Sequence, residues 1–179
     1  MQNDKPFTGH GWVALILLVA LLLDGTLTQV FAQWVMTPAV TGVPQLTLIA
    51  LLMITLQLPD EAYIVAIAGV VGLVFDSFYT GMLGVHMLLW PLLVYVVRQI
   101  EPLVPRTALY VGSVVIIGLT AYLAAYYFVS RFLGSTTATP IDLIAHHIGP
   151  GLGINLVLFA LSYAPLTHLL ARLKPESHA

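Results

Sequence analysis

The segment GLVFDSFYTGMLG, residues 72–84, places an aspartate between two long apolar runs. Aliphatic residues precede Asp76, and another aliphatic run begins after Gly84. Between them, Thr80-Gly81 is conventional turn chemistry. The segment therefore predicts two consecutive helices joined by a tight turn. It also raises the question of what a carboxylate does in such apolar surroundings.

The composition of the whole chain indicates an integral membrane protein. Of the 179 residues, 59% are hydrophobic and only 8% are charged, whereas soluble domains carry about 25% charged residues. The formal net charge of −2 has no clustered patch behind it, so a nucleic-acid partner is not expected. Because the chain has no cysteine, disulfides, thiolate metal sites and a cysteine nucleophile are excluded.

Six apolar segments approach or exceed the length of about 20 helical residues that crosses a bilayer. They are residues 11–36, 44–58, 61–78, 83–100, 107–132 and 152–173. Gly149-Pro150-Gly151 is expected to separate the last segment from an interfacial helix over residues 141–148. The sequence thus predicts one all-α domain over residues 1–179, a bundle of six transmembrane helices. A re-entrant second or third segment is the main topological alternative.

The basic residues predict the orientation of this bundle. With the N-terminus inside, all but one of the six lysines and arginines fall on the inner side, and Arg131 alone falls outside. The inner set is Lys5, Arg98, Arg106, Arg172 and Lys174. Because lysine and arginine favour cytoplasmic loops, both termini are predicted to be cytoplasmic. The expected location is the cell membrane, with several spans and short loops.

Asp24 lies near the middle of the first predicted span, and Thr28 continues the same polar face. A central aspartate costs about 2.5–3.5 kcal/mol on insertion scales, so it needs protein or water around it. Two interpretations stay open: an outward-opening cavity or partner-helix contact, and a buried carboxylate that serves packing. Other polar residues in the apolar segments are expected to be packed or hydrogen-bonded inside the bundle, namely His86, His168 and Asn155.

Asp76 is expected in the last turn of the third span, near the outer interface. There its carboxylate would accept hydrogen bonds from the backbone amides of residues 77–81. Small residues on the facing stripes of the third and fourth spans would let the two helices approach closely. These residues are Gly69, Gly72, Gly81 and Gly84. A structural hairpin is the favoured interpretation, and direct partner binding is the alternative.

The chain carries no convincing catalytic or metal-binding pattern. Asp142 and His146 lie one helical turn apart, with His147 next in sequence, and such a pair could contact a metal. No third ligand of suitable spacing is visible, so a polar helix edge is favoured. Asp24 and Asp76 could be imagined as a protease dyad, yet the chain lacks the Gly-x-Gly-Asp and Gly-x-Ser-x-Gly motifs. No catalytic residue, metal or cofactor is predicted.

The run Gly72-Leu73-Val74-Phe75-Asp76, followed by Gly81 and by Leu83-Gly84 before an apolar helix, resembles the signature of the rod-shape-determining protein MreD family. Val43-Pro44-Gln45-Leu46 is similar to that family's proline-polar-leucine start of the second helix. Leu23-Asp24-Gly25-Thr26, with the nearby Gln29, looks like the first-helix polar cluster of Gram-positive members. Met82 departs from the pattern, because the family often has proline or another small residue there.

The resemblance implies a fold like the substrate-binding S-components of energy-coupling-factor vitamin transporters. It also implies membership of the elongasome, which inserts lateral peptidoglycan, with MreC as partner and with MreB, RodA and a class B penicillin-binding protein nearby. The favoured function is a non-enzymatic membrane component of this cell-elongation (rod) complex. It would bind MreC and help position or regulate the peptidoglycan synthase. A vitamin-binding S-component is the alternative, and self-association as a homodimer is left open.

Overall fold

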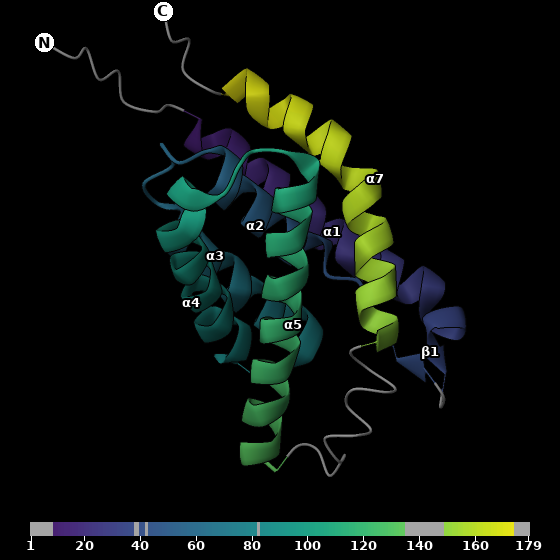
Figure 1. Ribbon diagram of the computed structural model, residues 1–179. Coiled ribbons are helices and arrows are strands. Elements are labelled where there is room, and N and C mark those ends of the chain that lie inside the picture. The colour runs from purple at the N-terminus through teal and green to yellow at the C-terminus, as the bar shows by residue number, and fades with distance from the viewer. Residues whose placement is uncertain (1–8, 38–39, 42, 82, 135–148, 174–179) are drawn as a thin grey trace, which may run out of the picture.

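The described part of the chain folds into a bundle of six α-helices in the computed structural model (Figure 1). The structure describes residues 9–37, 40–41, 43–81, 83–134 and 149–173. The helices are α1 His10–Val35, α2 Leu46–Gln57, α3 Ile64–Phe75, α4 Val85–Ile100, α5 Ala108–Phe132 and α7 Gly149–Leu173. Each begins and ends within three residues of the segment that the sequence predicts for it. The all-helical class is therefore confirmed, and the apolar helices are consistent with a membrane protein.

Short elements connect or extend these helices. A two-residue pair of antiparallel strands, β1 Met36–Thr37 and β2 Val40–Thr41, follows α1. A π-helical turn, η1 Asp76–Thr80, extends α3, and a 3-10 turn, η2 Glu101–Leu103, follows α4. Residues 72–84, which we call the signature segment, thus span the end of α3, the whole of η1 and the turn into α4.

The short helix α2 lies at the centre of the bundle. Every residue from Thr47 to Gln57 is buried, and α1, α4, α5 and α7 all contact the helix. An all-round apolar helix of this kind is typical of a core position. Its 12 residues extend only about 18 Å, so the N-terminus of α2 lies inside the protein and its free amides need partners there.

Helix lengths distinguish three long helices from the rest. Among the described residues, His10–Val30, Ala108–Phe132 and Gly151–Leu173 are long and apolar enough to cross a membrane. Leu46–Gln57 and Ile64–Thr80 are apolar but shorter. The second and third predicted spans, for which a re-entrant course was the alternative, are thus among the shorter helices.

The last predicted span begins three residues earlier than expected. Helix α7 starts at Gly149 and includes Pro150 and Gly151 in its first turn, and because the residues before Gly149 lie outside the described part, the break from a preceding helix stays a prediction. Proline is tolerated in the first helical turn, because the N–H that it lacks would have no intrahelical partner there. The interfacial helix predicted over residues 141–148 lies outside the described residues.

Candidate functional site

Asp76 is fully buried and caps the N-terminus of α4 from the end of the preceding helix. Its Oδ2 accepts the backbone amides of Gly84 at 2.9 Å, His86 at 3.0 Å and Met87 at 3.2 Å. Its Oδ1 also accepts the hydroxyl of Thr80 at 3.2 Å. The N-cap position of α4 is Gly84, which has no side chain to do this. The carboxylate therefore satisfies amides that would otherwise be unpaired, and its charge opposes the positive end of the helix dipole.

The donors differ from those expected for Asp76. The amides of residues 77–81 were predicted, whereas the structure brings in amides from the start of α4. The reason is that residues 76–80 stay helical as η1, so their own amides bond back along the helix. The chain reverses only afterwards, at Gly81 and Gly84, and this reversal carries the first turn of α4 up to the carboxylate.

His86 extends this contact to a third helix. Its Nδ1 lies 2.5 Å from Oδ1 of Asp76, and its Nε2 lies 2.6 Å from the hydroxyl oxygen of Tyr122 on α5. In the neutral imidazole, Nδ1–H donates to the carboxylate and Nε2 accepts the tyrosine O–H. All three side chains are buried. The resulting Asp76–His86–Tyr122 chain ties η1, α4 and α5 together through polar groups.

Aromatic rings enclose the imidazole. The rings of Phe75, Trp90 and Tyr126 lie with their centroids 4.7, 5.4 and 5.4 Å from that of His86. Trp90 is fully buried. Hydrogen bonds in such dry surroundings are strong, and losing one partner is costly. His86 is therefore a hydrogen-bonded core histidine, as predicted, whereas the same prediction is wrong for His168 of α7, which is exposed.

The four signature glycines divide into two pairs with different roles. A Cβ on Gly72 would lie 2.5 Å from the carbonyl oxygen of His86, so only glycine lets α3 and α4 approach this closely. A Cβ on Gly69 would lie 3.9 Å from the carbonyl oxygen of Met87, an ordinary contact. Gly81 and Gly84 have φ values of 67° and 104°, and an added Cβ on either would meet no atom within 4 Å.

The expectation of a second packing stripe through Gly81 and Gly84 is therefore wrong. Both residues precede α4 instead of lying along it. They are needed for their left-handed backbone conformation, which side chains disfavour. The close-approach interpretation holds for the α3 side of the hairpin, where Gly72 carries it.

Asp24 caps a different helix in the same manner. Its side chain is 2% exposed, and its two oxygens accept the backbone amides of Leu46 at 2.6 Å and Thr47 at 2.7 Å. These amides belong to the first turn of α2, whose N-cap residue Gln45 makes no side-chain capping bond. The geometry matches the interpretation of a buried carboxylate bonded to its neighbours.

Asn155 of α7 secures the chain just before α2. Its Oδ1 accepts the amide of Gln45 at 2.8 Å, and its Nδ2 donates to the carbonyl oxygen of Val43 at 3.0 Å. Its Nδ2 also donates to the carbonyl of Gly151 within its own helix. The expectation that Asn155 is hydrogen-bonded inside the bundle is confirmed. Together with Asp24, it fixes the buried end of α2 from two sides.

The signature segment also contacts the polar cluster of the first helix. Tyr79 of η1 packs against Gly25 so closely that a Cβ on Gly25 would overlap its ring. The Tyr79 hydroxyl donates to the carbonyl oxygen of Leu21 at 3.2 Å. Gly25 thus leaves room for a side chain from η1, and the two sequence clusters that carry Asp24 and Asp76 meet in the fold.

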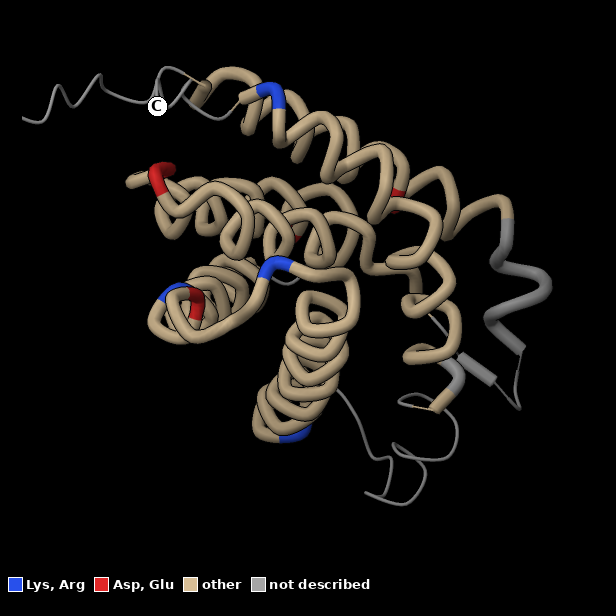
Figure 2. The backbone as a smooth tube through the Cα atoms, turned by 45° about the horizontal axis from the view of Figure 1, so that its top comes forward, with Lys and Arg blue, Asp and Glu red and all other residues tan. Residues whose placement is uncertain are grey.

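A further polar cluster, which the sequence did not reveal, lies at the opposite ends of the helices. The fully buried carboxylate of Glu61 has both oxygens 2.7 Å from Nδ1 of His10. Arg98 donates to the backbone carbonyls of Glu61 and Ala62. These contacts join the start of α1, the α2–α3 connection and the end of α4. Figure 2 shows how sparse charged positions are along the rest of the bundle.

The buried carboxylates are engaged in holding helix ends. Asp24 and Asp76 accept amides of two different helices, so the contacts do not describe a catalytic dyad. Within the described residues, no group of three or more His, Asp or Glu could hold a metal ion. Asp142, His146 and His147 lie outside the described residues. What this site does chemically is to stabilise helix termini inside an apolar bundle.

Comparison with models of protein families identifies the family to which this chain belongs. The family model of the rod shape-determining protein MreD matches residues 10–173, which run from the first residue of α1 to the last residue of α7. The chain belongs to the MreD family. No curated protein and no solved structure matches it. The resemblance that rests on the Asp76 segment is therefore confirmed at the level of the family.

Membership of the MreD family fixes the broad function. MreD proteins are membrane components that determine rod shape, and they act as structural components of the cell-shape machinery. The long apolar helices of this chain agree with a membrane location. The likeness to Gram-positive members and to S-components stays a prediction.

Proposed function

We propose that this chain is a non-enzymatic component of the cell-elongation complex that binds MreC in the membrane. In this role it helps position or regulate the peptidoglycan synthase formed by RodA and a class B penicillin-binding protein, near the MreB filament. The family match supports the assignment to the rod-shape machinery. MreC binding and synthase positioning are our extension of it.

The observation that carries the proposal is the way in which the buried polar groups are used. Asp24 and Asp76 are both occupied by backbone amides of neighbouring helices. The outer faces of the helices are largely apolar, with exposed residues such as Val70 on α3 and Leu161 on α7. A rigid bundle that presents apolar helix faces is suited to bind other membrane-spanning helices.

The proposed topology has six spans and cytoplasmic termini. The six helices follow one another in alternating directions, and the connection between α4 and α5 holds Arg106 beside Glu101. Arg98 and Arg172 lie in the last turns of α4 and α7, whereas Arg131 lies in the last turn of α5. Because α5 runs opposite to α4 and α7, Arg131 is at the other side. The positive-inside rule supports cytoplasmic termini.

Co-purification with MreC tests the proposal. The tagged full chain is expressed with MreC, extracted in mild detergent and captured, and the retained MreC is quantified. We expect MreC to remain bound, and an unrelated multi-pass membrane protein with the same tag serves as control. A chain that shows a cooperative thermal transition and still never retains MreC would contradict the proposal.

The vitamin-binding alternative gains no support from the family match. A bound vitamin would stabilise the chain by mass action, so a thermal-shift screen with vitamins tests this alternative separately. We expect no vitamin to raise the melting temperature.

A further inference from the structure

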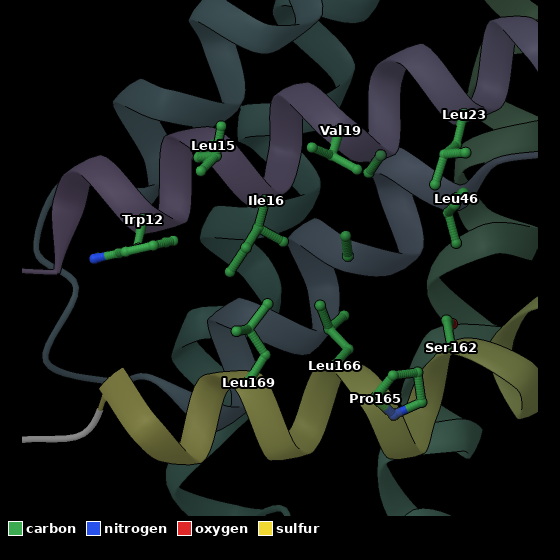
Figure 3. Close-up of a pocket in the computed structure, with 12 residues that line it drawn as sticks. Trp12, Leu15, Ile16, Val19, Leu23, Leu46, Ser162, Pro165, Leu166 and Leu169 are labelled. Atoms are coloured by element: carbon green, nitrogen blue, oxygen red, sulfur yellow. The ribbon is translucent and has the colours of Figure 1, made fainter.

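An apolar groove of about 350 Å³ runs along the bundle between α1 and α7 (Figure 3). Trp12, Ile16 and Val19 form the α1 wall, and Leu166 and Leu169 form part of the α7 wall. Ala50 of the central helix α2 lies at the floor. The one hydroxyl in the lining belongs to Ser162, and it donates to the carbonyl oxygen of Phe159. The lining therefore offers almost no polar atom to a ligand.

The lining of the groove decides which kind of ligand fits it. Its α1 wall extends over about three helical turns, from Trp12 to Leu23, and is apolar along that length. Water would find too few polar partners there. A flexible hydrocarbon chain matches both the length and the apolar lining of the groove.

The groove has a polar end where α1 begins and α7 ends. Trp12 is the first groove residue of α1, is 57% exposed and carries an indole N–H. Arg172 follows Leu169 by three positions and Pro165 by seven, which places it at the same edge of α7, one turn further on. Tryptophan and arginine at this level of a membrane protein are typical of the headgroup region.

Arg172 differs from the other arginines that the structure describes. Arg98 donates to backbone carbonyls, Arg106 pairs with Glu101, and Arg131 donates to the hydroxyl of Tyr127. Within the described residues, Arg172 is exposed and has no hydrogen-bond acceptor or carboxylate partner. An unpaired cation beside an apolar groove complements a ligand with an anionic head and a hydrocarbon tail.

We propose that the α1–α7 groove binds one anionic phospholipid, with an acyl chain between α1 and α7 and its phosphate near Arg172 and Trp12. This inference is independent of MreC binding. The orientation proposed above would place the lipid in the inner leaflet, because α1 begins and α7 ends on the cytoplasmic side. A bound lipid would fill the groove and join two helices at the edge of the bundle.

Native mass spectrometry of the full chain in detergent tests this site. Phosphatidylglycerol and phosphatidylcholine with identical acyl chains are added in turn. We expect one phosphatidylglycerol to be retained, with about fivefold preference over phosphatidylcholine, as one basic side chain near an anionic headgroup provides. Arg172→Gln should abolish the preference and leave the fold and the neutral lipid binding unchanged.

A pair of matched variants on α1 tests the position of the acyl chain. Val19→Trp fills the α1–α7 groove, whereas Leu18→Trp enters a second apolar groove between α1 and α3. The two wild-type residues are similarly exposed, at 48% and 50%. We expect Val19→Trp to lose the retained lipid and Leu18→Trp to keep it, with both variants melting near the wild-type temperature.

Three results would overturn the proposal. They are the absence of any retained lipid, an unchanged phosphatidylglycerol preference in Arg172→Gln, and equal lipid loss in the two tryptophan variants. If Val19→Trp fails to fold, Arg172→Gln decides the matter alone.

Discussion

Asp76 and His86 meet through a 2.5 Å hydrogen bond between their side chains, and the same carboxylate also accepts the backbone amide of His86 at 3.0 Å. One acidic residue thus holds both the backbone and the side chain of a residue at the start of the next helix. Because the hydroxyl of Tyr122 is hydrogen-bonded to Nε2 of the same imidazole, the hydrogen-bonded chain that starts at Asp76 extends to α5. A charge in an apolar chain is therefore used here to fix the geometry of three helices.

Removal of the Asp76 carboxylate should destabilise the bundle strongly. Asp76→Ala leaves three backbone amides and Nδ1–H of His86 without an acceptor, and each buried donor left unsatisfied costs about 1–3 kcal/mol. Asp76→Asn keeps one oxygen and should cost less. Unfolding in mixed detergent measures the difference. The exposed Asp60 provides a control, since Asp60→Ala should change the stability by less than about 0.5 kcal/mol. Equal stability of Asp76→Ala and Asp60→Ala would refute the capping role.

The two glycines of α3 should respond oppositely to the same substitution. In Gly72→Ala the new methyl meets the carbonyl oxygen of His86, a rigid backbone atom, and we expect a loss of about 1–3 kcal/mol from overpacking. In Gly69→Ala the new methyl makes only ordinary contacts. The higher helix propensity of alanine should then leave stability unchanged or raise it by up to about 1 kcal/mol. Comparable losses in both variants would show that α3 and α4 do not pack in this register.

Loss of the Tyr122 hydroxyl should weaken the same network from α5. Tyr122→Phe leaves Nε2 of His86 without a donor in a buried site, and such an unpaired group costs about 1–3 kcal/mol. Tyr110 is 52% exposed, so Tyr110→Phe is a matched control with little expected effect. A double-mutant cycle with Asp76→Asn should give a coupling of at least about 0.5 kcal/mol. Additive effects would mean that the three side chains do not act as one network.

Asp24 can be assigned to the bundle or to a partner by comparing stability with MreC retention. If Asp24 is a cap for α2, Asp24→Ala should lower the stability by about 2 kcal/mol, the upper end of the range for helix caps. Asp24→Asn should lose less and still retain MreC. An Asp24→Asn variant that melts like wild type but releases MreC would instead place Asp24 in the partner contact.

Much of the architecture could be predicted because it is local. Apolar runs bounded by Pro59-Asp60 or by Pro102 and Pro105 mark the helices directly, and the observed ends differ from the predicted ones by at most three residues. The difference of three residues at the start of α7 arose because Gly149-Pro150-Gly151 was assigned to the connection, although the first turn of a helix accepts proline.

The connections between helices could not be predicted in the same way. Asp24 lies 22 residues before the amide of Leu46 that it caps, and no spacing rule links the two. The contact between His86 and Tyr122 spans 36 residues and depends on how α4 and α5 pack. Even the donors for Asp76 depend on η1, because one π-helical turn moves the reversal of the chain to Gly81. For the contact between Asp76 and His86, the one indication in the sequence is that His86 lies two residues after Gly84, at the start of the next predicted helix.

Hydrogen exchange at three backbone amides tests the central claim, that Asp76 works as a helix cap, most directly. In the full chain reconstituted in nanodiscs, the amides of Gly84, His86 and Met87 should exchange slowly and should become much faster in Asp76→Ala. The amides of Leu46 and Thr47, which Asp24 caps, should keep their protection in that variant. If the three α4 amides exchange as fast in the wild-type chain as in Asp76→Ala, the capping role is contradicted.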